Sequence, residues 1–154
     1  MFVVMRGHHA LALPILAASL YAQTYIVDSN NGPGTNYTQI STAVAAVPDG
    51  SVLLVRAGAY STFAISAKSL TVRGEPGVVI TPTPFVTNAI AVLNLQPHQA
   101  VALQTLTFAS ASPSPFATTN VMCSNNQGTV HLDNLRCANN NSSVGQIWGT
   151  NCSQ

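Results

Sequence analysis

Charged side chains are scarce in this chain of 154 residues. Only 6% of its residues are Asp, Glu, Lys or Arg, against roughly 25% in an average soluble domain. So few charges argue against salt-bridged helices and favour extended structure. Because Lys and Arg do not cluster, we expect neither a nucleic-acid partner nor a polybasic membrane anchor. One Trp and four Tyr are too sparse to indicate a platform on which sugar rings stack.

Acidic residues are equally few, which limits the chemistry that the chain can perform. Cleavage of glycans requires carboxylates in pairs or clusters, or a basic residue supported by several acids. The four acids are instead dispersed, at Asp28, Asp49, Glu75 and Asp133. The sequence also has no convincing metal-ligand spacing, so we expect no cofactor and no metal.

Three residues in the last quarter of the chain are the only catalytic candidates. On a strand, His131 and Asp133 would share one face while Leu132 points to the other. His131 could then be a base oriented by Asp133, with Arg136 nearby to bind an anionic sugar. The alternative, a solvated outer face that carries an ion pair, is the interpretation we favour. We therefore assign no catalytic residue.

The N-terminal segment has the pattern of a secretory signal peptide. Arg6 precedes an apolar run, Ala10–Leu20, which is followed by small residues. The run is too short to cross a bilayer, which takes roughly 20 residues per helix. We expect residues 1–22 to be removed by cleavage after Ala22, although Ser19 is a second possible site and a buried helix is the alternative. The mature protein would be secreted, into the extracellular or periplasmic space of a bacterial host.

The mature domain, residues 23–154, begins with a strand and a helix and continues with strands alone. Four apolar residues at i, i+3, i+4 and i+7 predict an amphipathic helix near residues 38–47, capped by Asn36 or Thr38. A strand at Thr24–Asp28 precedes it. The later expected strands are Val52–Val55, Phe63–Ile65, Leu70–Arg73, Val78–Ile80, Ile90–Leu95, Val101–Phe108, Val121–Cys123 and Val130–Cys137.

A repeat of 29 residues predicts how the strands are arranged. Val101–Phe108 and Val130–Cys137 share V-x-L-x-x-L-x-[FC] at this offset. A less regular copy begins at Leu70, at an offset near 31. The offset of 29 also aligns three further blocks: Ala91–Gln96, Asn120–Asn125 and Gly149–Gln154. Fixed periods of roughly 20–50 residues indicate solenoids. With short strands and no helix in each period, we expect a single-stranded parallel β-helix with rungs over about 52–154.

The stretch from Tyr37 to Ile80 resembles the first turns of the secreted, pectin-lyase-like right-handed parallel β-helix superfamily. The resemblance lies in Y-T-Q-I-S-T-A-V-A-A-V-P-D-G, S-V-L-L-V-R-A-G-A-Y and S-L-T-V-R-G-E-P-G-V-V-I, in that order. It implies an all-β, right-handed solenoid whose N-terminal end is capped by the short helix. It also implies that the first coil turns at Arg56-Ala57-Gly58. The aspartate pairs and Gly-His-Gly motif of the family's enzymes are missing, so the resemblance indicates a fold and not a reaction.

The C-terminal end of the solenoid has no sequence pattern that would cap it. Gln154 falls just inside what the repeat marks as a new rung. We therefore expect the domain either to be truncated, as part of a longer protein, or to end in a frayed coil.

The three cysteines are expected to form one disulfide and one free thiol. Cys123 and Cys152 are one repeat of 29 residues apart, so they should occupy equivalent places in successive rungs. Neighbouring strands lie about 4.8 Å apart, within the Cα separation that a disulfide allows. Cys137 instead matches Phe108 in the repeat, which predicts an inward, buried and unreactive thiol.

Two groups of polar residues are expected to be structural. The segment Asp28–Gly32 faintly resembles a calcium loop, but its Gly is misplaced and the distal Glu is missing, so an Asx-rich turn is favoured. Asparagines stacked at solenoid corners usually satisfy backbone groups, although they could also bind sugars. The asparagines in question are Asn125, Asn126, Asn134, Asn139, Asn140 and Asn141.

Two functions fit these expectations. The first is a secreted, non-catalytic β-helix module that is structural or adhesive, or that contacts a polysaccharide or cell-surface glycan. The alternative is the N-terminal part of a divergent polysaccharide lyase or glycoside hydrolase whose catalytic rungs lie beyond residue 154.

Overall fold

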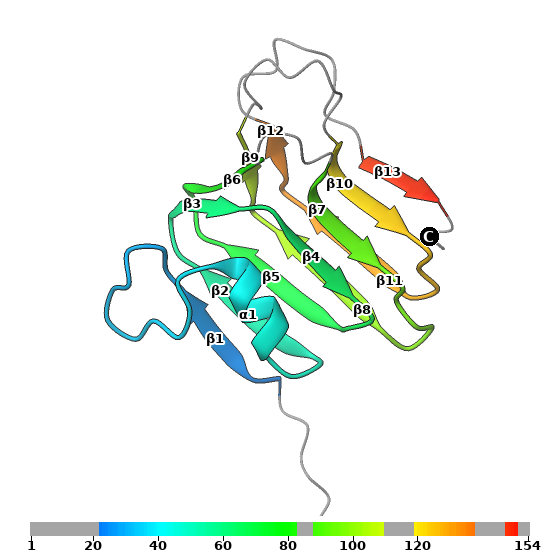
Figure 1. The fold of residues 1–154 in the computed structure, drawn as a ribbon, viewed down its shortest axis with the longest axis horizontal. Coiled ribbons are helices and arrows are strands. Elements are labelled where there is room, and N and C mark those ends of the chain that lie inside the picture. The colour runs from blue at the N-terminus through cyan, green and yellow to red at the C-terminus, as the bar shows by residue number, and fades with distance from the viewer. Residues whose placement is uncertain (1–21, 83–87, 110–118, 138–146, 151–154) are drawn as a thin grey trace, which may run out of the picture.

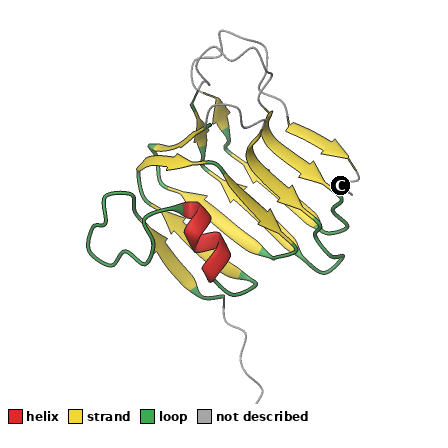
Figure 2. Cartoon of the chain, in the orientation of Figure 1, coloured by secondary structure: helices red, strands yellow, loops and turns green. Residues whose placement is uncertain are grey.

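The computed structural model describes residues 22–82, 88–109, 119–137 and 147–150, which form one helix and thirteen strands (Figures 1 and 2). All of the expected signal segment except Ala22 lies outside these residues. The helix is α1, Ile40–Ala46. The strands are β1 Thr24–Val27, β2 Ser51–Val55, β3 Gly58–Ser61, β4 Phe63–Ser66, β5 Leu70–Gly74, β6 Val78–Thr81, β7 Asn88–Leu93, β8 Ala100–Gln104, β9 Thr107–Phe108, β10 Thr119–Ser124, β11 Thr129–Asp133, β12 Arg136–Cys137 and β13 Ile147–Thr150.

The strands form three parallel sheets that are the faces of a β-solenoid of about four turns. Sheet A has the order β1-β2-β5-β8-β11, sheet B the order β3-β6-β9-β12, and sheet C the order β4-β7-β10-β13. Each turn of the chain adds one strand to each sheet (Figure 1). The expected parallel β-helix architecture is therefore confirmed.

Hydrophobic alternation decides which side chains enter the core. In sheet A, one inward row consists of Leu53, Val72, Leu103 and Leu132, which lie opposite one another in register. The first three are fully buried. Burying each such side chain contributes about 1.5–3 kcal/mol to folding. The solenoid core is thus built from rows of similar residues that repeat once per turn.

The registers confirm part of the expected repeat and correct the rest. Val130 lies opposite Val101, at the expected offset of 29, and Val101 lies opposite Leu70, at 31. In sheet C, however, Cys123 lies opposite Val92, an offset of 31 where 29 was expected. The error arises because a strand shifted by two residues presents the same face, so alternation alone does not distinguish the two registers.

The corners between sheets are shorter and sharper than the sequence pattern suggests. Thr105 and Asn134 have φ angles of 54° and 49°, in the left-handed region. They break each of the long strands expected at Val101–Phe108 and Val130–Cys137 into two, one in sheet A and one in sheet B. Asn adopts this conformation readily, whereas for the β-branched Thr105 it is unusual. The strand β3 was also not expected; the turn was placed at Arg56-Ala57-Gly58, and Gly58 is in fact the first residue of this strand.

Asparagines hold the other corner together. Asn94 and Asn125 also have positive φ angles, and Asn125 Nδ2 donates to Asn94 Oδ1 at 2.8 Å. Asn126 is buried; its Oδ1 accepts the Leu95 N–H and its Nδ2 donates to the Val92 carbonyl. The expected structural role, in which an asparagine satisfies backbone groups, is confirmed at Asn126, whereas Asn125 contacts another asparagine side chain. Asn139, Asn140 and Asn141 lie outside the described residues.

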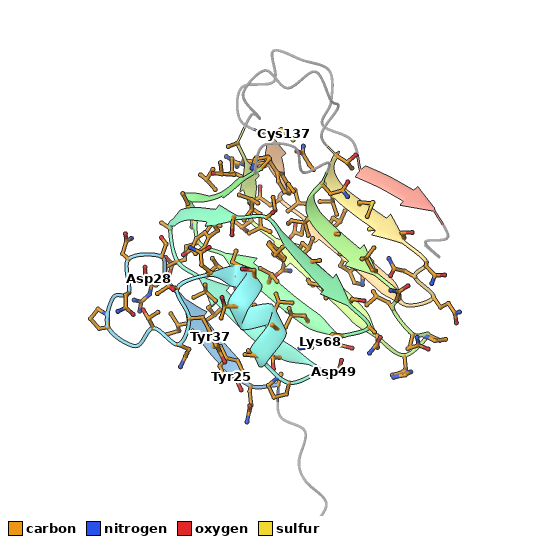
Figure 3. All side chains as sticks on the ribbon, in the orientation of Figure 1. Tyr25, Asp28, Tyr37, Asp49, Lys68 and Cys137 are labelled. Atoms are coloured by element: carbon orange, nitrogen blue, oxygen red, sulfur yellow. The ribbon has the colours of Figure 1, made fainter. Side chains whose placement is uncertain are left out.

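The N-terminal end of the solenoid is covered. Helix α1 contacts β1, β3 and β4, and its stripe of Ile40, Ala43 and Val44 is buried, as expected for a cap. Lys68 Nζ donates to the carbonyls of Val44 and Val47 at 2.7 and 2.8 Å, which satisfies the C-terminal end of the helix. Figure 3 shows Lys68 close to this end.

The expected side-chain cap at the start of the helix is wrong. The N-cap residue is Gln39, which makes no capping hydrogen bond. Asn36 is used differently, because its Oδ1 accepts the Ile26 N–H and its own N–H donates to the Ile26 carbonyl. These bonds cover the outer edge of β1 and engage the Asn36 side chain there instead of at the helix.

Candidate functional site

The fold separates the three catalytic candidates. His131 and Asp133 are exposed on the outer face of β11, while Leu132 between them points inward. The solvated outer face is therefore confirmed. The ion pair that was expected on it is not formed, since in the described part of the chain the salt bridge is between Arg56 and Asp28.

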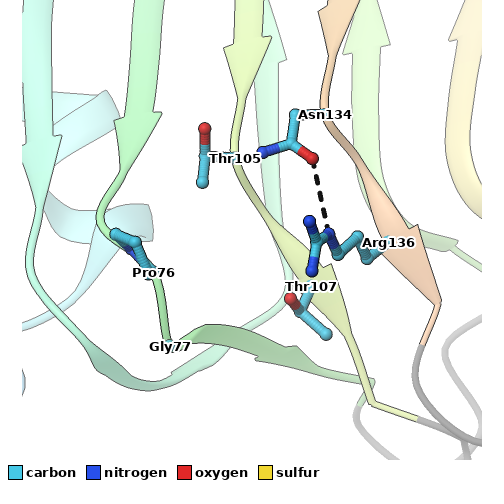
Figure 4. Close-up of a pocket in the computed structure, with 6 residues that line it drawn as sticks. All are labelled: Pro76, Gly77, Thr105, Thr107, Asn134 and Arg136. Carbon is cyan, nitrogen blue, oxygen red and sulfur yellow. Dashed lines mark hydrogen bonds between the residues drawn. The ribbon is translucent and has the colours of Figure 1, made fainter.

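Arg136 lies around the corner on β12, where it lines a pocket of about 140 Å³ (Figure 4). The six lining residues are Pro76, Gly77, Thr105, Thr107, Asn134 and Arg136. They come from three successive turns: the β5–β6 turn, the β8–β9 corner and the β11–β12 corner. The pocket is thus a product of stacking, in which each turn contributes two residues.

The left-handed corners place these side chains. Thr105 and Asn134 occupy equivalent positions in neighbouring turns, and Thr107 lies opposite Arg136 in sheet B. Asn134 Oδ1 accepts a hydrogen bond of 3.4 Å from Arg136 Nε. Figure 4 shows the Arg136 guanidinium beside Thr107 and Asn134. The repeat contained a signal for this grouping, because the offset of 29 already pairs Thr105 with Asn134 and Thr107 with Arg136.

The pocket is suited to binding polar groups. A guanidinium, two threonine hydroxyls and an amide offer several hydrogen-bond donors, and the described carboxylates form no salt bridge with Arg136. None of the six lining residues is an acid, a histidine or a lysine. The pocket therefore offers recognition groups, with the positive charge favouring an anionic or hydroxyl-rich ligand.

The Asp28 loop is a structural turn, as expected, and is shown in Figure 3. Asp28 is buried, and its carboxylate accepts the N–H groups of Asn30 and Gly32 at 2.9 and 3.1 Å and Arg56 Nη1 at 3.1 Å. These contacts, the Asn30 bond first, lower the pKa of Asp28, although burial opposes them. No group of three potential metal ligands occurs among the residues that the structure describes.

The lowered pKa makes the stability of the fold sensitive to acid at Asp28. Because the ordinary pKa is 3.8 and the folded value is lower, the stabilisation is complete above the ordinary value and is lost as pH falls through the folded value. We expect Asp28→Asn to reduce stability at neutral pH and to flatten the loss of stability in acid. Urea unfolding between neutral pH and pH ~3 measures both effects. Glu75→Gln, at an exposed turn position, is the control and should change neither; an unaltered acid response of Asp28→Asn would contradict the prediction.

The cysteines require one correction. Cys137 lies opposite Phe108, as expected, but it is exposed where a buried thiol was predicted. The reason is that β12 is the last strand of sheet B in the described chain, so no further strand covers its outer side. Asn120 Nδ2 donates to Cys137 Sγ at 2.8 Å.

The predicted Cys123–Cys152 disulfide stays a prediction, because Cys152 lies outside the described residues. Its stated basis is wrong, however. Strand β13 pairs with β10 so that Gly149 lies opposite Cys123, and the equivalence of Cys123 and Cys152 in successive rungs is not observed. Cys123 itself is buried.

Comparisons with known proteins identify no relative: no family model, no curated protein and no solved structure matches this chain. Within the described segments, no helix has the length and apolar character needed to span a membrane.

Proposed function

We propose that this protein is a secreted, non-catalytic β-helix module that contacts carbohydrate through the pocket around Arg136. We also propose that it belongs to the pectin-lyase-like superfamily and coils in the right-handed sense, the hand of nearly all parallel crossover connections. The observation that carries the binding proposal is a pocket in which Arg136, which forms no salt bridge with any described acid, stands beside hydroxyl and amide groups.

Several features support binding over catalysis. None of the four acids lines the pocket. Asp28 binds Arg56, Asp49 accepts the Ser69 N–H, and Glu75 and Asp133 are exposed at other positions. A pocket without a carboxylate or imidazole has no group for ordinary acid–base catalysis. A guanidinium with neighbouring hydroxyls can instead hold the hydroxyl or acidic groups of a sugar.

The proposal is tested by measuring the binding of neutral and acidic oligosaccharides to the wild-type protein and to Arg136→Ala. We expect binding to weaken at least about tenfold in the variant, because hydrogen bonds to a charged group contribute about 1.5–3 kcal/mol. Arg73→Ala is the matched control, since Arg73 is also an exposed arginine but does not line the pocket.

Two results would contradict the proposal. The first is equal affinity for wild type and Arg136→Ala across the panel. The second is turnover of an acidic polysaccharide that disappears in Asp133→Asn, which would restore the catalytic interpretation of His131 and Asp133.

A further inference from the structure

Two corners of the solenoid share one backbone geometry. Asn94 and Asn125 follow β7 and β10, Thr105 and Asn134 follow β8 and β11, and all four have φ angles between 49° and 57°. At the first corner, the Asn94 N–H donates at 3.2 Å to the carbonyl directly before Asn125. At the second, the Thr105 N–H donates at 3.0 Å to the carbonyl directly before Asn134. The two corners therefore place their side chains in equivalent positions, one turn above the other.

The side chains at the two corners differ. At the first corner they form an asparagine ladder, in which Asn125 Nδ2 donates to Asn94 Oδ1 at 2.8 Å. At the second corner Thr105 has no amide oxygen to continue such a ladder. Asn134 Oδ1 accepts Arg136 Nε at 3.4 Å, and in the described part of the chain Asn134 Nδ2 donates to no protein acceptor. Figure 4 shows this nitrogen directed toward Thr105. The ladder is thus interrupted at the pocket.

Thr105 is an unfavourable residue for its position in the corner. A β-branched side chain is strained in the left-handed region, whereas an asparagine adopts this conformation readily and would also supply the missing bond of the ladder. Residues that cost stability in this way cluster at functional sites, where the strain keeps a group in a useful position. Because Thr105 lines the pocket, the strained residue and the free Asn134 amide occur at the same place.

We propose that Thr105 controls binding at this pocket by keeping the Asn134 amide available to the ligand, a role that rests on the proposed carbohydrate function. The bond from Arg136 Nε holds the amide so that its N–H groups face the neighbouring turn. Asn134 Nδ2 and the Arg136 guanidinium can then donate together to oxygen atoms of one sugar. An asparagine side chain at position 105 would accept the amide N–H in place of the ligand. Thr105 is therefore a positioning residue that acts through Asn134.

The test is an NMR titration of isotope-labelled protein with methyl β-glucuronide, a sugar that carries both hydroxyl groups and a carboxylate. The side-chain amide signal of Asn134, identified by its absence from Asn134→Gly, should shift as the probe is added to wild type. In Thr105→Asn we expect this signal to be displaced before any probe is added and to move no further. The same variant should bind the probe about fivefold more weakly, since one hydrogen bond to the ligand is lost. Its melting temperature should rise by about 4 °C, because strain is relieved and the ladder is completed.

Two further variants isolate the cause of the weaker binding. In Asn134→Gly the amide is gone, so combining it with Thr105→Asn should weaken binding no further than Asn134→Gly alone. Ala67→Asn is the matched control, because Ala67 has a φ of 48° at the other corner, one turn before Asn94, and does not line the pocket. An asparagine there can extend the existing ladder. This variant should therefore gain stability as well, but bind the probe as wild type does.

The outcomes separate a failure of this role from a failure of the proposed function. A wild-type protein that does not bind the probe, or whose binding is unchanged in Arg136→Ala, contradicts the proposed function and the role of Thr105 with it. If Arg136→Ala weakens binding but Thr105→Asn binds as tightly as wild type, the role of Thr105 alone is overturned. A further loss of affinity in the double variant also overturns it, because the effect then belongs to the threonine hydroxyl and not to the Asn134 amide.

Discussion

Replacing Leu103 by alanine is expected to lower the free energy of unfolding by about 2–5 kcal/mol. Leu103 is fully buried in the third turn of sheet A, opposite Val72 on one side and Leu132 on the other. Its own strand, β8, is hydrogen-bonded to β5 on one side and to β11 on the other, so the backbone around Leu103 has little freedom to move into the space left by the lost methyl groups. The loss of stability therefore has two parts: the apolar surface that is no longer buried, and the cavity that remains in the core.

Leu54→Ala is the matched control, because it removes the same atoms from the outer face of the same sheet. Leu54 is 37% exposed and points away from the core. Its replacement should cost less than about 1 kcal/mol. Urea unfolding of both variants at neutral pH measures the difference. Equal losses of stability would show that the inward and outward faces of sheet A are wrongly assigned.

Replacing Gly128 by alanine is expected to destabilise the fold by about 3 kcal/mol or more, which is large for the addition of one methyl group. The added Cβ would overlap the carbonyl oxygen of Gln99 and lie 2.6 Å from that of Gln96. Both are backbone atoms, and the Gln99 carbonyl, which directly precedes β8, accepts the N–H of Thr129, the first residue of β11. To relieve the overlap, the backbone must shift at Gly128, directly before β11 begins, or at Gln96 and Gln99 on the neighbouring turn.

Gly50→Ala separates this overlap from the ordinary effect of losing a glycine. Gly50 has a φ of 77°, but a Cβ there would meet no atom within 4 Å. Its replacement should cost only the strain of a left-handed alanine, about 1–2 kcal/mol. Thermal or urea unfolding of the two variants decides the matter, and a Gly128→Ala variant no less stable than Gly50→Ala would show that the close approach of the two turns is absent.

Much of the fold could be predicted from periodicity alone. The stripe that includes Ile40, Ala43 and Val44 predicted the capping helix, and alternation predicted that Leu132 points away from the face that carries His131 and Asp133. The pattern shared by Val101–Phe108 and Val130–Cys137 predicted that these segments lie one above the other, and they do. These features are local or repeat exactly once per turn, so they are visible in a single sequence.

The candidate site was only partly predictable. Arg136 was singled out for binding an anionic sugar, and it does line a pocket, but the grouping with His131 and Asp133 was wrong for that site. The left-handed corner at Asn134 turns the chain between Asp133 and Arg136, which places them on different sheets. A spacing of three residues on a strand does not reveal such a corner.

The sequence by itself determined the class of fold, the helical cap and the outward side of β11, because the 29-residue repeat, the helical stripe and a period of two residues specify these. Only the tertiary structure decided the register of sheet C, the exposure of Cys137 and the pocket at the corner. A register that shifts by two residues keeps every side chain on its face, so polarity does not select it. The burial of Cys137 depends on whether a strand from another turn of the chain covers it. The grouping of Thr107 with Arg136 likewise depends on β9 and β12, from two different turns, lying side by side.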